Sequence, residues 1–182
     1  MGRDTNPERQ YRLREIGNIF MEKKINDSCI SCSYTTGKDQ SVGGQIYATQ
    51  HWIVEHAFGM SLPGFLILKT KRHIEEADEL HPAEAREMGM VLQKVTSAIR
   101  FVTGAQKVYI LKFGEGVRHL HFWVFPRTAA VRRQIGIGPK AVALISKQYK
   151  VGDMTAQNIK AIGRTAKAIQ IFLNKKKTRT TT

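Results

Sequence analysis

The alternation of apolar and polar positions divides the chain into helical and extended segments. Apolar residues recur every three or four positions from Met88 to Ile99, which predicts one helix that opens at His81-Pro82 and closes at Gly104. Apolar or alternating runs predict strands at residues 45–48, 51–54, 65–68, 107–113 and 119–125. Residues 7–24 have loosely helical spacing, and residues 27–44 are polar and rich in turn formers.

This order of elements predicts an α+β fold with a mostly antiparallel sheet and one main helix. The signals for strands stop after Arg127, and the remaining residues look helical. We therefore divide the chain into an N-terminal helix in residues 1–27, a body in residues 28–127 and a helical C-terminal extension in residues 128–182. A length of 182 residues suits one domain of typical size with small extensions.

Composition narrows the class of protein. With 42% apolar and 24% charged residues, the chain is typical of a globular protein rather than a disordered one. No stretch approaches the ~18 apolar residues that span a bilayer, and the N-terminus has no apolar signal region. Two cysteines are too few for a disulfide scaffold. We expect a cytoplasmic protein that makes no contact with a membrane.

The net charge of +14 is unevenly distributed. Residues 1–27 contribute +1, residues 28–127 contribute +2, and residues 128–182 contribute +11, with Asp153 as their single acid. A near-neutral body therefore precedes a strongly basic extension, and this asymmetry suggests that the two parts do different things.

The string from Arg118 to Arg127, RHLHFWVFPR, contains the most informative residues of the body. Residues two apart in a strand point the same way, so His119, His121 and Trp123 should share one face while the residues between them fill the core. From spacing alone, these side chains form either a polar sheet surface or a functional site.

A second candidate feature is the CxxC motif Cys29-Ile-Ser-Cys32. It can be half of a zinc site, a redox motif or a chance occurrence, and no strand of the kind that precedes a thioredoxin-type redox motif is predicted before it. His73 and His119 each border a predicted strand. Two cysteines and two histidines would complete a tetrahedral zinc site.

The segment from Pro63 to His73, the helix, and the segment from His119 to Arg127 together resemble the histidine-triad (HIT) superfamily. That family combines a strand ending in "PKxH", a helix and the motif HxHxHxxPR, and the resemblance covers about residues 28–127. It implies a nucleotide hydrolase or nucleotidyltransferase that forms a homodimer. It also implies zinc bound by Cys29, Cys32, His73 and His119, with His121 as the nucleophile.

The chemistry that the resemblance implies suits an imidazole. A neutral imidazole can attack an α-phosphorus if a partner on its other nitrogen fixes its tautomer. Gly114-Glu115-Gly116 occupies the place of the family's phosphate-binding Gly-Gln-Ser stretch, where backbone N–H groups can approach an anionic oxygen. From the residues alone, the same stretch is equally a plain hairpin turn.

Two residues depart from the family pattern. Trp123 replaces the third histidine, and its indole N–H can contact phosphate but cannot protonate a leaving group. The transferase branch has Gln at this position, so the departure weakens the hydrolase expectation most. Ala57 replaces an aspartate that binds ribose hydroxyls in many members, so we expect ribose recognition to be lost or moved.

The basic extension contains its own candidate site. Gly136, Gly138 and Lys140 lie in a Gly-x-Gly-Pro-Lys turn that resembles the hairpin of helix-hairpin-helix modules, which grip nucleic-acid backbone. The alternative is a helical hairpin broken by glycines. Lys160, Arg164 and Lys167 line one helical stripe. These residues predict sequence-independent binding of RNA or DNA, and the alternative function is a catalytically impaired HIT-fold protein that binds nucleic acid or nucleotides.

Overall fold

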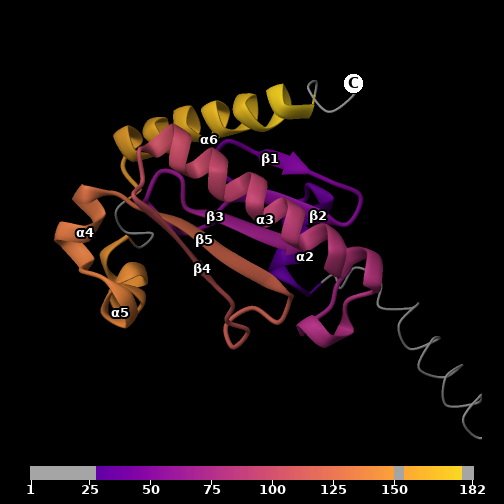
Figure 1. Ribbon diagram of the computed structural model, residues 1–182. Helices are drawn as coiled ribbons and strands as arrows, with labels where there is room; N and C mark the ends of the chain where they lie inside the picture. Colours follow the sequence, from indigo (N-terminus) through magenta and orange to yellow (C-terminus); the bar gives the residue numbers. More distant parts are fainter. Residues whose placement is uncertain (1–27, 150–153, 178–182) are drawn as a thin grey trace, which may run out of the picture.

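The computed structural model describes residues 28–149 and 154–177, so the helix expected in residues 1–27 lies outside the described residues. Its centre is a five-stranded sheet in the order β1-β2-β3-β5-β4, with every neighbouring pair antiparallel (Figure 1). The strands are β1 (Gln45–Ala48), β2 (Trp52–His56), β3 (Leu66–Thr70), β4 (Lys107–Leu111) and β5 (His121–Arg127). The predicted α+β class with an antiparallel sheet is confirmed.

The main helix α3 (Pro82–Thr103) has the predicted bounds. Pro82 lies in its first turn, and the Glu84 carboxylate accepts a hydrogen bond from the His81 N–H at 2.8 Å, which satisfies a backbone donor at the helix start. Gly104 ends the helix in a left-handed conformation with a φ of 65°. Local capping chemistry therefore fixes both ends.

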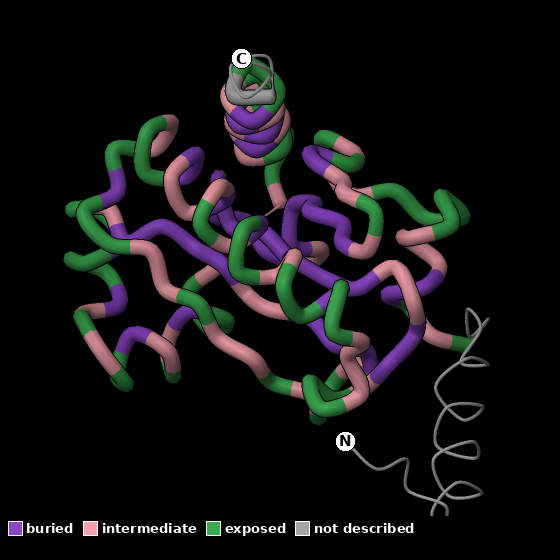
Figure 2. Tube along the Cα trace, turned by 45° about the vertical axis from the view of Figure 1, so that its right-hand side comes forward, coloured by how far each residue is buried: buried purple, intermediate pink, exposed green. Residues whose placement is uncertain are grey.

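One face of the sheet packs against α3 and α6 (Ala156–Lys177), which lie beside each other in Figure 1. Leu66, Leu68 and Val124 point to this side, where they meet Val95 of α3 and Ile169 of α6 in one buried cluster. Figure 2 shows the buried positions of α6 gathered on its inward side. The buried apolar residues of α6, namely Ala166, Ile169 and Leu173, therefore belong to the main core.

The opposite face packs against α4 (Ala129–Ile135) and α5 (Gly138–Gln148). Phe65 and Phe125, which alternate with the residues of the first face, form a second buried cluster with Ile135, Ala141 and Ile145. The helices that follow Arg127 thus cover both faces of the sheet.

Some elements differ from the expectations. The segment expected to be turn-rich contains α2 (Ile30–Thr36), a helix that ends at Gly37 with a φ of 78°. Strand β3 continues to Thr70, and β5 begins at His121 rather than His119. A short 3-10 helix, η1 (Ala77–Glu79), precedes α3. Among residues 28–149 and 154–177, no helix combines the length and apolar character needed to cross a membrane.

Candidate metal centre and active site

Four predicted ligands come together from separate parts of the chain. Cys29 precedes α2, Cys32 lies in its first turn, His73 follows β3, and His119 precedes β5. Their ligand atoms all lie within 4.8 Å of one another. The Cys32 Sγ lies 3.4 Å from Nδ1 of His73 and 3.6 Å from Nδ1 of His119, and the Cys29 Sγ also lies 3.6 Å from that nitrogen.

These separations fit a tetrahedral zinc site. Zn–S and Zn–N bonds of about 2.3 and 2.0 Å place sulfur and nitrogen about 3.5 Å apart at tetrahedral angles. The three sulfur–nitrogen distances of 3.4–3.6 Å match that value. A single metal bonded to all four atoms accounts for the three separations together, whereas each hydrogen bond would join only one sulfur to one nitrogen. The donor set and its geometry therefore fit zinc.

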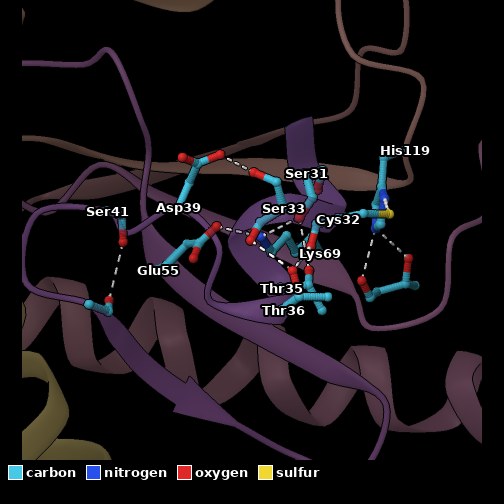
Figure 3. Close-up of polar contacts among 12 residues, drawn as sticks. Ser31, Cys32, Ser33, Thr35, Thr36, Asp39, Ser41, Glu55, Lys69 and His119 are labelled. Atoms are coloured by element: carbon cyan, nitrogen blue, oxygen red, sulfur yellow. Dashed lines mark hydrogen bonds and ion pairs between the residues drawn. The ribbon is translucent and has the colours of Figure 1, made fainter. Parts of the chain in front are cut away.

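The imidazole of His119 is held in the form that binds a metal. Its Nε2–H donates to the Thr70 carbonyl at 2.9 Å, which leaves the Nδ1 lone pair directed at the sulfurs of Cys29 and Cys32. Figure 3 shows His119 beside Cys32. Burial lowers the pKa of His119 to about 4, because the charged imidazolium would lose its hydration. The ring is neutral at physiological pH.

His121 is connected to this cluster through the backbone. Its Nδ1 lies 2.6 Å from the His119 carbonyl oxygen, which can only accept, so Nδ1 carries the hydrogen. In the neutral ring, Nε2 therefore has the lone pair. His121 and Trp123 line one cavity, whereas His119, which the spacing placed on the same strand face, lies before β5 and belongs to the Cys/His cluster.

The cavity has a volume of about 210 Å³ and is largely apolar, with four aromatic rings in its wall. Tyr34 of α2 stacks on Phe58 at 5.4 Å between ring centroids. Trp123 makes an edge-on contact with Phe113 at 5.6 Å, and all four rings border the cavity. Walls of this kind suit a planar, weakly polar group such as a nucleobase.

Two buried charges in the cavity wall were missed by the sequence analysis. Lys69 donates to the Ser31 carbonyl at 2.9 Å, and its Nζ lies 2.6 Å from the Glu55 carboxylate (Figure 3). Burial lowers the pKa of Lys69, and Glu55 opposes that shift. The available signal was Glu55 itself, a charged residue directly after the apolar run Trp52-Ile-Val.

The stretch Gly114-Glu115-Gly116 contributes one residue to the cavity wall. Gly116 lines the cavity beside Val117. The N–H of Gly114 donates instead to the exposed Glu115 carboxylate at 3.1 Å, and this bond lowers the pKa of that carboxyl. Ala57 also lines the cavity.

The candidate polyanion-binding residues lie on two different sides of the sheet. Gly136 and Gly138 join α4 to α5, where the Gly138 N–H donates to the Tyr109 hydroxyl at 3.0 Å. The exposed Lys140 lies in the first turn of α5, which covers one face of the sheet. The exposed side chains of Lys160, Arg164 and Lys167 extend from α6, which covers the other face.

The fold and this site define a protein of the histidine-triad fold with a buried Cys/His cluster. A zinc-bound histidine-triad family protein from Mycobacterium smegmatis has a TM-score of 0.60 to this chain at 18% identity, covering 83% of this chain and 96% of its own. A HIT-like protein involved in cell-cycle regulation from Bartonella henselae has a TM-score of 0.59 at 18% identity, with 81% and 98% coverage.

A hypothetical histidine triad nucleotide-binding protein from Sulfolobus tokodaii has a TM-score of 0.59 at 15% identity, covering 82% of this chain and 94% of its own. No family model matches the sequence, and no curated protein matches it. At these identities the likeness establishes the fold, and the function has to be argued from the residues of the site.

Proposed function

We propose that this protein is a HIT-type nucleotide hydrolase or nucleotidyltransferase that attacks a nucleoside-phosphate linkage through His121. The observation that carries the proposal is the hydrogen bond from Nδ1 of His121 to the His119 carbonyl, at 2.6 Å. It fixes the tautomer whose Nε2 lone pair is available as a nucleophile, on a side chain that lines the aromatic cavity. The zinc-bound and nucleotide-binding neighbours of the same fold support this reading.

The reaction has two displacements. The Nε2 lone pair of His121 forms a bond to the α-phosphorus, and the bond from phosphorus to the leaving-group oxygen breaks with its electron pair. Water or an acceptor hydroxyl then attacks phosphorus and releases its proton to solvent, and the N–P electron pair returns to Nε2. Nδ1 keeps its hydrogen throughout, and the His119 carbonyl stabilises the positive charge of the substituted ring.

Trp123 limits the leaving groups that this site can expel. Its indole borders the cavity at the position of the family's third histidine, where it cannot donate a proton to the leaving oxygen. We therefore expect turnover of substrates whose leaving group departs as a stable anion, such as pyrophosphate or a nucleoside polyphosphate.

The test is to trap the covalent intermediate. Wild-type protein incubated with nucleotides labelled at the α-phosphate should form an acid-labile, base-stable phosphoramidate. His121→Ala should form none, and His51→Ala, which changes a histidine that does not line the cavity, should behave as wild type. Absence of both label and turnover in wild type with all four nucleoside triphosphates and dinucleoside polyphosphates contradicts an enzymatic function.

The proposal includes zinc as a resident structural metal on Cys29, Cys32, His73 and His119, where it would hold α2 to the segments that follow β3 and precede β5. It also includes a homodimer formed through α3. Met90 and Phe101 support this, because they are 59% and 75% exposed on α3. Sedimentation equilibrium should give a dimer that Phe101→Glu dissociates.

A second candidate function is binding of RNA or DNA through residues 128–182. Its support is exposed positive charge without compensation: in the described part of this segment no carboxylate side chain occurs and no basic residue forms an ion pair. Retention on heparin or duplex RNA should weaken steeply with salt. One triple variant tests the basic stripe of α6: Lys160→Gln, Arg164→Gln and Lys167→Gln. A second triple variant tests the opposite face of the sheet: Arg132→Gln, Arg133→Gln and Lys140→Gln. If both variants are retained as strongly as wild type, this function is contradicted.

A further inference from the structure

The cavity wall contains one carboxylate among the described residues, Glu55 on β2. Strand β2 pairs with β3 so that Ile53 faces Lys69, which places Glu55 diagonally across from Lys69 on the same side of the sheet. The Lys69 ammonium lies 2.6 Å from Oε1 of Glu55. The second carboxylate oxygen, Oε2, accepts no hydrogen bond from any residue that the structure describes.

Fold stability does not explain this arrangement. The side chains of Glu55 and Lys69 are 7% and 1% exposed, so both ions have lost nearly all their hydration. Replacing such a pair by apolar side chains is often neutral or stabilising, because desolvation offsets the attraction between the charges. A carboxylate that lines an apolar cavity and has one oxygen anchored by Lys69 is instead a preorganised hydrogen-bond acceptor.

The position of Glu55 relative to His121 fits a ligand that spans the cavity. His121 on β5 pairs with Lys69 on β3, and β2 is the next strand, so about 10 Å separates the strands of His121 and Glu55. Ala57 lies two residues beyond Glu55 on the same side of β2 and also lines the cavity, but it offers no side-chain acceptor. Glu55 is therefore the acidic acceptor that this strand presents to the ligand.

We propose that Glu55 is a specificity-determining residue whose Oε2 accepts a hydrogen bond from a donor on the nucleoside part of the substrate. The donor is either a sugar hydroxyl or an N–H group of the base. Lys69 acts as a positioning residue, because it holds the other carboxylate oxygen and joins Glu55 to α2 through the Ser31 carbonyl. This inference rests on the proposed nucleotide substrate and identifies what discriminates among nucleotides.

Glu55→Gln makes a directional test possible. The Lys69 ammonium requires an acceptor, so the amide oxygen of Gln should turn towards Lys69 and its NH₂ group towards the cavity. The substitution thus converts the acceptor that meets the ligand into a donor, with almost no change in shape. Asp78→Asn is the matched control, since it removes the same charge from an exposed residue away from the cavity.

The experiment measures dissociation constants by calorimetry for AMP, GMP, CMP and UMP with the full chain. The tightest binder is then compared with its 2′-deoxy, 3′-deoxy and base-donor-deleted analogues. Wild type and Asp78→Asn should prefer the parent over one analogue by about tenfold or more, the value of a hydrogen bond to a charged group. Glu55→Gln should lose that preference, and the analogue concerned identifies the donor as sugar or base.

Equal discrimination in wild type and Glu55→Gln overturns the inference while leaving the proposed function intact. If wild type discriminates against none of the analogues, the role of Glu55 is likewise overturned and the proposed function stands. If wild type binds none of the four nucleotides, the role of Glu55 and the proposed function are both overturned. Because Glu55→Gln leaves the buried Lys69 without its counter-ion, the fold is checked by thermal melting. If the single variant does not fold, Glu55→Leu combined with Lys69→Met removes both charges and the acceptor, and the same loss of preference is expected.

Discussion

Substitution of Cys32 by serine should abolish a stabilising zinc site, and the size of the effect follows from the geometry. Cys32 is fully buried and its Sγ lies 3.4–3.6 Å from two imidazole nitrogens, so it is the central ligand of the four. We expect about one zinc bound per wild-type chain. At free zinc a thousandfold above its dissociation constant, binding to the folded state alone adds about 4 kcal/mol to the free energy of unfolding.

For a chain of 182 residues, 1 kcal/mol shifts the melting temperature by about 2–4 °C, so saturating zinc should raise it by roughly 8–16 °C. Differential scanning calorimetry with zinc and with a chelator measures the shift, and elemental analysis gives the stoichiometry. Cobalt substitution should add the absorption of tetrahedral thiolate coordination. Thr36→Ala, an exposed change on the same helix, should keep both the metal and the shift.

Cys32→Ser should bind no zinc at the wild-type ratio, and its melting temperature should not respond to zinc. The reasoning is refuted if wild type melts at the same temperature with zinc and with chelator, or if Cys32→Ser keeps one tightly bound zinc. Either result would mean that the sulfur–nitrogen contacts are ordinary weak hydrogen bonds in a metal-free core.

Three further predictions concern other parts of the molecule. Burial alone would raise the pKa of Glu84, but the hydrogen bonds from Arg72 and from the His81 N–H outweigh it and lower this pKa below 4.5. The ionised carboxylate thus stabilises the fold above pH 4.5, and this stabilisation is lost as the pH falls through the lowered pKa of Glu84 in the folded protein. On acidification, the melting curves of Glu84→Gln should therefore converge on those of wild type. Ile169→Ala in α6 should cost about 2–5 kcal/mol in urea unfolding, whereas Ile171→Ala, at a position that is 45% exposed, should cost at most about 0.5 kcal/mol; equal costs would mean that α6 does not pack on the core. Trp123→His should raise hydrolysis of nucleotides with poor leaving groups by about a hundredfold, measured as initial rates, and an unchanged rate would exclude a missing proton donor as the limit.

The parts of the fold that the sequence could predict are those decided by local chemistry. Pro82 and Gly104 mark both ends of α3 because a proline suits a first turn and a glycine a left-handed end. Helix α2 was missed because its seven residues show no apolar repeat. Its position depends on long-range contacts, such as the Lys69 ammonium on the Ser31 carbonyl, which no local pattern records.

The candidate site divides in the same way. Residue types and a family resemblance were enough to propose Cys29, Cys32, His73 and His119 as one cluster, and the structure brings their ligand atoms within 4.8 Å. The pairing of Glu55 with Lys69 could not be predicted, because a strand pattern indicates which positions are apolar or polar but not which charges lie opposite one another on neighbouring strands. The same limit applies to Lys140 and Lys160, which share one basic segment in the sequence but lie on helices that cover opposite faces of the sheet.

The Cys/His cluster and the cavity are built from the same segments of the backbone. Helix α2 carries Cys32 to the cluster and Tyr34 to the cavity wall, and its Ser31 carbonyl receives the ammonium that anchors Glu55. His119 contributes its ring to the cluster and its carbonyl to Nδ1 of His121. Any displacement of these two ligating segments therefore moves the cavity wall, the Glu55 anchor and the tautomer-fixing carbonyl together. The positions of the four residues are thus a condition for the proposed chemistry at Nε2 of His121.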